Sequence, residues 1–186
     1  MTRLTAAPTS AAALLAVALL SGCGGAETPA PPAPPPPTST RDAEPCSFLP
    51  QPVITTNGLK QVSSNKAQTS RSCSWTSAHF SMMVLVRWDQ STLVDFAQAF
   101  PTSVTNIDLD GATAVSGKSE SRPACAAAVF PEQGTVMEIV VGDTPPSTTD
   151  SACARVKTIG AAVVHEVRAQ HLFPGPTAAP ATPTTS

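Results

Sequence analysis

The sequence predicts a single α+β domain, a mainly antiparallel sheet with two packed helices that disulfide bonds reinforce. Alternating strand-like runs are joined by short turns rather than long crossovers, which favours antiparallel pairing. Two other stretches have the three- and four-residue spacing of amphipathic helices. The 186-residue chain has only 4% aromatic residues and no Tyr, so its core is lean and needs covalent reinforcement.

The first half of the domain predicts a hairpin. Residues 46–49 lead into the domain, and residues 53–59 are expected to form a helical turn that ends at Asn57-Gly58. Residues 71–76 and 79–88 alternate like strands and should pair. One face of the second strand carries Phe80, Met82, Val84, Val86 and Trp88, and the other carries Ser81, Met83, Leu85 and Arg87.

A short helix is expected next, over residues 92–100. Thr92 and Asp95 give it a capping-box start, and Pro101 ends it. The Asp110-Gly111 pair then predicts a turn into a strand over residues 112–115.

The last elements are a second hairpin and the longest helix. Residues 124–130 should pair with residues 135–141 across the turn at 131–134. The helical pattern from residue 150 to about residue 170 follows. It places these residues at helical spacing: Cys153, Val156, Gly160, Val163 and Val167. Strands, helix, strands, helix is the order expected of an α+β domain.

The N-terminus has the layout of a bacterial lipoprotein signal. Arg3 is the only charged residue among the first 26, and the apolar run 11–20 is shorter than the roughly 20 residues that span a bilayer. The run ends in Leu-Ser-Gly-Cys at 20–23, a pattern at which lipid is attached to cysteine. We expect residues 1–22 to be a signal peptide and Cys23 to carry a covalent lipid such as palmitate. The alternative is an ordinary secretory signal with a soluble product.

The segments that flank the domain are low in complexity. Residues 23–42 hold the lipidated cysteine and a tether with seven prolines between positions 28 and 40. The tail, residues 174–186, repeats this Pro/Thr/Ala composition without charge. We expect both segments to be disordered and residues 43–173 to form one globular domain.

Five cysteines are an odd number, and a lipid on Cys23 accounts for the odd one. The other four should form disulfides in an oxidising compartment. Chain order suggests Cys46 with Cys73 and Cys125 with Cys153, although three connectivities are open. No two cysteines have the C-x-x-C spacing of a zinc site, so we expect no metal.

Charge and motifs exclude several classes of function. The formal net charge is −2 and no Lys/Arg cluster occurs, which argues against nucleic acid as a partner. The three histidines are scattered, and the chain has no Gly-x-Ser-x-Gly nucleophile elbow. We therefore expect no catalytic residue, no enzyme activity and no cofactor besides the lipid on Cys23.

Three apolar side chains are candidates for a ligand or partner surface. Trp75 and Trp88 could stack on a glycan or an apolar ligand, and Met83 could line a groove for an acyl chain or a peptide. We favour the simpler interpretation, in which the tryptophans fill the core and the two helices cover both faces of the sheet.

Several short motifs together resemble a known family. They are Glu44-Pro45-Cys46-Ser47-Phe48-Leu49, Cys73-Ser74-Trp75, Asp110-Gly111-Ala112-Thr113-Ala114, Cys125, and Asp150-Ser151-Ala152-Cys153. The set resembles the actinobacterial four-cysteine lipoproteins of the LprB type, a domain of unknown function, number thirty-five fifty-eight in its series. The likeness covers residues 44–171, and Glu44 departs from the usual Asp-Pro-Cys opening. It implies a signal, a lipid anchor, two disulfides and a compact sandwich related to the PsbP and Mog1 shape, and it implies no catalytic residue.

These features predict a non-enzymatic lipoprotein of the cell envelope. The lipid should hold it in the cell membrane at the extracytoplasmic face, where the tether lets the domain reach an envelope protein partner. The alternative is an extracytoplasmic carrier or sensor that binds a small apolar or glycan ligand.

Overall fold

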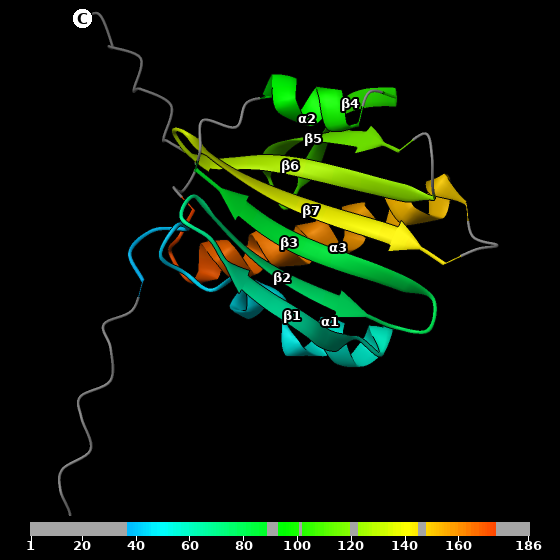
Figure 1. The fold of residues 1–186 in the computed structure, drawn as a ribbon, viewed down its shortest axis with the longest axis horizontal. Coiled ribbons are helices and arrows are strands. Elements are labelled where there is room, and N and C mark those ends of the chain that lie inside the picture. Colours follow the sequence, from blue (N-terminus) through cyan, green and yellow to red (C-terminus); the bar gives the residue numbers. More distant parts are fainter. Residues whose placement is uncertain (1–36, 89–92, 101, 120–122, 145–147, 174–186) are drawn as a thin grey trace, which may run out of the picture. The chain divides into compact units, whose positions relative to one another are not determined.

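The computed structural model describes residues 37–173 except 89–92, 101, 120–122 and 145–147. Seven antiparallel strands form one sheet in the order β1-β2-β3-β7-β6-β5-β4, with helices packed on it (Figure 1). In chain order the elements are η1 (Pro45–Phe48), α1 (Gln51–Asn57), β1 (Lys60–Lys66), β2 (Ser70–Thr76), β3 (Phe80–Arg87), α2 (Leu93–Ala99), β4 (Thr102–Leu109), β5 (Ala112–Lys118), β6 (Ala124–Glu132), β7 (Thr135–Asp143) and α3 (Thr149–Ala169). The predicted α+β class with an antiparallel sheet is confirmed.

The sheet consists of two meanders joined side by side. Strands β1, β2 and β3 pair in sequence, and so do β4, β5, β6 and β7. The join is the pairing of β3 with β7, from Phe80 opposite Asp143 to Arg87 opposite Val136. Both predicted hairpins are therefore present, and they meet at the centre of the sheet.

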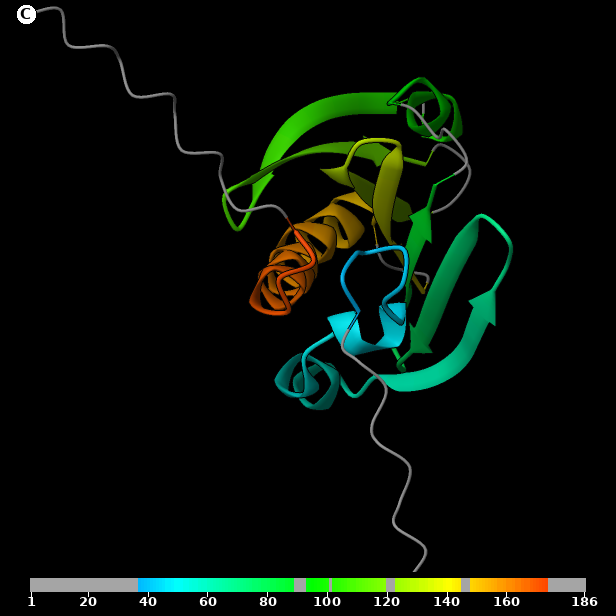
Figure 2. The same ribbon diagram turned by 90° about the vertical axis from the view of Figure 1, so that its left-hand side faces the viewer.

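Helices lie on both faces of the sheet. Helix α3 packs against β4 to β7, η1 packs against β2 and β3, and the sheet curves around them (Figure 2). We call the face of the sheet that carries α3 and η1 the inner face. Helix α2 packs against β5 on the opposite face, which we call the outer face. Helix α1 confirms the predicted helical turn and makes a third α-helix.

The core follows the alternation of the strands. On β3, the side chains of Phe80, Met82, Val84 and Val86 are all buried on the inner face, as predicted. They share one cluster with β7 and α3, including Ile139, Val156 and Val163. A smaller cluster lies under α2 on the outer face. Its members are Phe96, Phe100, Val115, Ala126, Ala128 and Val136.

Two disulfides fasten the inner-face helices to the sheet. Cys46 of η1 is bonded to Cys73 of β2, and Cys125 of β6 to Cys153 of α3, which confirms the predicted pairing. The partners are 27 and 28 residues apart. Loops of this length imply about 3.5 kcal/mol of stabilisation per bridge in the chain-entropy model.

The ends of the described chain are tied together by a set of hydrogen bonds that we call the clasp. The fully buried Thr40 hydroxyl donates to the Leu172 carbonyl at 3.0 Å. Arg41 donates to the Thr135 hydroxyl at 2.7 Å, and Arg71 to the Asp42 carbonyl at 2.6 Å. We expected the domain to start at residue 43. Residues 40–42 already bond to it, so the packed structure begins a few residues earlier.

The two edge strands, β1 and β4, were not predicted. Strand β1 has one apolar residue, Val62, and no buried position, so it carries no alternating pattern. Strand β4 has a register irregularity between Thr102 and Thr105. Strand β1 is held by main-chain pairing with β2 alone, whereas β4 also buries Leu109 and packs Ile107 against the inner core. No helix in the described part is long and apolar enough to cross a membrane.

Candidate functional site

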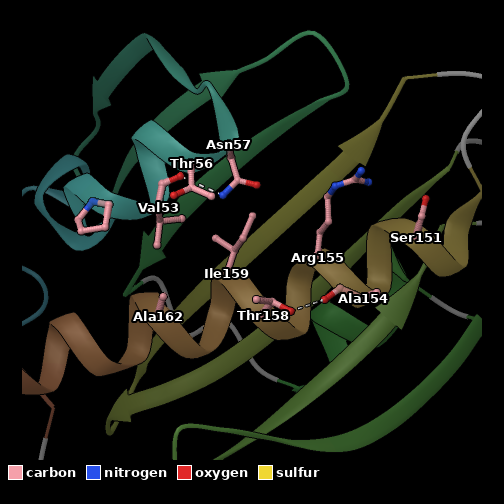
Figure 3. Close-up of a pocket in the computed structure, with 10 residues that line it drawn as sticks. Val53, Thr56, Asn57, Ser151, Ala154, Arg155, Thr158, Ile159 and Ala162 are labelled. Atoms are coloured by element: carbon pink, nitrogen blue, oxygen red, sulfur yellow. Dashed lines mark hydrogen bonds between the residues drawn. The ribbon is translucent and has the colours of Figure 1, made fainter.

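A groove runs between α1 and α3, on the side of α3 that the sheet does not cover (Figure 3). We call it the α1–α3 groove, and its volume is about 590 Å³. Its lining residues are Pro52, Val53, Thr56, Asn57, Ser151, Ala154, Arg155, Thr158, Ile159 and Ala162. This volume lies within the roughly 300–1,000 Å³ of small-molecule sites.

One end of the groove holds a cation in a fixed position. Arg155 Nη1 donates to Asp143 Oδ2 at 2.6 Å, and the guanidinium carbon lies 4.9 Å from the centre of the Phe80 ring. The Asp143 side chain has no exposed surface, and Ser151 Oγ donates to the same oxygen. The Arg155 side chain is 33% exposed. A buried carboxylate and a ring therefore hold the guanidinium while part of it faces the groove.

Polarity changes along the groove. Arg155 and Ser151 lie at one end, whereas Val53 and Ile159 point toward one another near the other end, beside Ala162 (Figure 3). The Asn57 amide donates to the Val53 carbonyl and belongs to the wall of α1. The arrangement offers a cation at one end and apolar side chains toward the other, where Thr56 and Asn57 add polar groups on the wall of α1 (Figure 3).

A second candidate surface lies on the outer face over β1 to β3, which we call the outer patch. Its members are Val62, Ser74, Thr76, Ser81 and Met83, within a depression of about 620 Å³. Val62 is 64% exposed, compared with 39% for Val104 and 40% for Phe130, the other exposed large apolar residues of the described structure. In the described structure, α2 covers β5 rather than this part of the sheet. The patch combines apolar side chains with hydroxyl groups.

The structure places the three side chains predicted for a ligand or partner surface in different environments. Trp75 is 2% exposed and packs in the inner core, two residues along β2 from the disulfide-bonded Cys73. Trp88 is half-buried and packs against the same core cluster. Met83 alone lies on an open surface, the outer patch. Cys23, the predicted lipidation site, lies outside the described residues.

Polar contacts elsewhere hold elements together. His165 Nδ1 lies 3.2 Å from Asp110 Oδ2, and Arg168 donates to the Asp110 carbonyl, so α3 is tied to the β4–β5 turn. Lys118 donates to Asp150 at 2.8 Å and lowers the pKa of that carboxyl through the hydrogen bond and its charge. No group of three or more His, Cys, Asp or Glu in the described structure could hold a metal ion.

Comparison with known protein families identifies the family of this chain. The family model described as "Protein of unknown function (DUF3558)" matches residues 18–166, which is most of the chain. The chain belongs to the DUF3558 family. No curated protein and no solved structure matches it. The likeness of this DUF3558 domain to the PsbP and Mog1 shape therefore stays a prediction.

The α1–α3 groove of the DUF3558 domain was not foreseen. Its walls come from α1 and α3, which are about a hundred residues apart, and neither wall carries a catalytic motif. One signal was present in the sequence. Ala154, Thr158 and Ala162 repeat at four-residue spacing, which places small side chains in a stripe along one face of α3.

Proposed function

We propose that this protein is a non-enzymatic lipoprotein of the cell envelope, of the LprB type, that binds a protein partner. A lipid on Cys23 would anchor it in the cell membrane, with the domain on the extracytoplasmic face. The length of the Pro-rich tether would set how far the domain can extend from the membrane. No nucleic acid, metal or other cofactor enters this proposal.

The cysteine pairing carries the proposal. Four of the five cysteines bond to one another, so none of them is left for Cys23. Two disulfides also fit an exported protein, because thiols in the cytosol stay reduced. The family match begins at residue 18 and so includes the Leu-Ser-Gly-Cys stretch at 20–23. A fifth cysteine, which the two disulfides do not use, at the end of a signal-like run supports lipid attachment.

The outer patch supports a protein partner. Its exposed Val62 and half-buried Met83 lie among serine and threonine hydroxyls, and protein interfaces commonly combine an apolar centre with a polar rim. The β1 edge beside it offers unpaired main-chain groups that a partner strand could bond.

The anchor is tested by cell fractionation. Cells that make the wild type, Cys23→Ala or the neighbouring control Gly24→Ala are separated into membrane and soluble fractions. We expect the wild type and the control in the membrane fraction and Cys23→Ala outside it. If Cys23→Ala partitions with the membrane like the wild type, the lipid anchor is wrong.

The partner is tested by crosslinking in intact cells before extraction. Val62→Glu should reduce crosslinking to a defined envelope protein. The matched control is Val104→Glu, because Val104 is also an exposed valine of an edge strand, at the opposite edge of the sheet. Equal crosslinking by both variants would show that the outer patch is not the interface.

A second candidate function is an extracytoplasmic carrier or sensor of a small ligand. The α1–α3 groove favours it, because the groove has the size of a ligand site and a fixed cation at one end. Native mass spectrometry of protein purified from its own organism tests this candidate. A small molecule that copurifies supports it, and the unliganded mass alone contradicts it.

A further inference from the structure

We propose that the α1–α3 groove binds a single-chain fatty acid, with the carboxylate at Arg155 and the alkyl chain between Val53, Ile159 and Ala162. This inference rests on the second candidate function and names its ligand class. It does not depend on the lipid anchor.

The charge of the groove favours an anionic head group. Among the described residues that line it, Arg155 alone is charged. Its counter-ion, Asp143, has no exposed side-chain surface, so it orients Arg155 from below and presents no carboxylate to the ligand. Guanidinium carries five N–H donors, and Nη1 alone bonds to Asp143 in the described structure. The rest of the fork can donate to a carboxylate.

The walls favour an alkyl chain over a peptide. Both walls are helices, whose main-chain groups bond within the helix. An extended peptide in this groove would leave most of its own N–H and C=O groups unpaired, which is costly. An alkyl chain has no such groups, and the half-buried Val53 and Ala162 offer it apolar contact over Ile159, which is 3% exposed.

The walls also disfavour a glycan. Sugar sites commonly place an aromatic ring against the apolar face of the sugar, and none of the described residues that line this groove is aromatic. The change from polar to apolar along the groove instead matches a molecule with one polar end (Figure 3).

The test is isothermal titration calorimetry of the exported chain carrying Cys23→Ser, purified without detergent so that no attached lipid or micelle competes. The probes are laurate and dodecanol, both below their aggregation concentrations. They share the alkyl chain and differ in the head group. We expect saturable binding of laurate at one site and about tenfold weaker binding of dodecanol, which lacks the charge-assisted bond.

Two variants locate the site. Ala162→Trp fills the apolar end and should weaken laurate binding about tenfold or more. Lys157→Trp is the control, because Lys157 is exposed on the same helix and does not line the groove. It should bind laurate within about twofold of the parent chain. Thermal melting checks that both variants are folded.

Three results would overturn the inference. They are no saturable binding of laurate, equal affinity for laurate and dodecanol, and unchanged laurate binding by folded Ala162→Trp. Native mass spectrometry separates this inference from the carrier function. A copurified ligand of another class keeps the carrier function and rejects the fatty acid. The unliganded mass alone rejects the carrier function, and the absence of laurate binding rejects the fatty acid in either case.

Discussion

Gly117 of β5 is the position where one added methyl group should have the clearest effect. A Cβ at Gly117 would lie 2.6 Å from Phe100 Cβ and 2.9 Å from the Phe100 carbonyl oxygen. Neither atom can move by side-chain rotation, so the main chain at Phe100, directly after α2, would have to shift by about 1 Å to restore normal contact. Overpacking of this kind costs about 1–3 kcal/mol, and the loss should fall on the outer-face cluster under α2.

Gly142 of β7 is the matched control, on the same face of the same sheet. A Cβ there would lie 3.5 Å from Ser81 Oγ, an ordinary contact. Neither glycine has a positive φ, so alanine fits both backbones and the comparison isolates the steric difference. Because alanine is favoured over glycine in strands by about 0.5–1 kcal/mol, Gly142→Ala should be neutral or stabilising.

Urea unfolding with both disulfides intact measures the difference between the two variants. The gain from alanine applies to both variants and cancels, so we expect Gly117→Ala to be less stable than Gly142→Ala by about 1–3 kcal/mol. Thermal unfolding should show a lower Tm, by about 2–4 °C for each kcal/mol. The close packing of α2 on β5 is refuted if the two variants agree within about 0.5 kcal/mol.

Three further predictions concern polar contacts. Lys118 lowers the pKa of Asp150, so the stability from this pair is present above the unfolded pKa of the carboxyl and is lost as pH falls through the lower folded pKa. In an NMR titration, Lys118→Met should return the pKa of Asp150 to its ordinary value. An unchanged pKa would contradict the pairing. Arg155→Gln leaves the buried Asp143 carboxylate without its cation. It should lower the free energy of unfolding in urea by about 2–3 kcal/mol, less than for a fully buried pair because Arg155 is partly exposed. The double variant with Asp143→Asn should lose less stability than the sum of the two single variants, and simple additivity would show that the pair is not coupled. Thr40→Val removes the buried hydrogen bond of the clasp and should cost about 1–2 kcal/mol, whereas unchanged stability would mean that the clasp contributes nothing.

The sequence predicted elements whose side chains must be buried. The alternation of Phe80, Met82, Val84 and Val86 follows the burial of β3 residue by residue. The Asp110-Gly111 pair occupies a two-residue hairpin turn, with both residues at positive φ. These patterns are local, so one stretch of sequence contains them whole.

The features that the sequence did not predict depend on residues that are far apart in the chain. Strand β1 has almost no apolar residues, and its pairing with β2 makes it a strand. Glu138 lies on the face opposite Met137 and Ile139 and is only 7% exposed, and Arg87 of β3 pairs with it at 2.5 Å. The α1–α3 groove likewise needs two helices that the fold brings together. Burial of a charged residue and the shape of a groove are properties of the assembled sheet.

The clasp also decides how the domain would bear a mechanical load. A pull on the chain from its N-terminal side would first strain the hydrogen bonds of Thr40 and Arg41. A few residues later the force would reach Cys46, which is covalently bonded to β2 inside the sheet. Beyond the clasp, tension would therefore pass through the bridge to Cys73 and spare the noncovalent packing of η1. A domain held by this end against flow or a moving partner could lose the clasp and still keep its sheet.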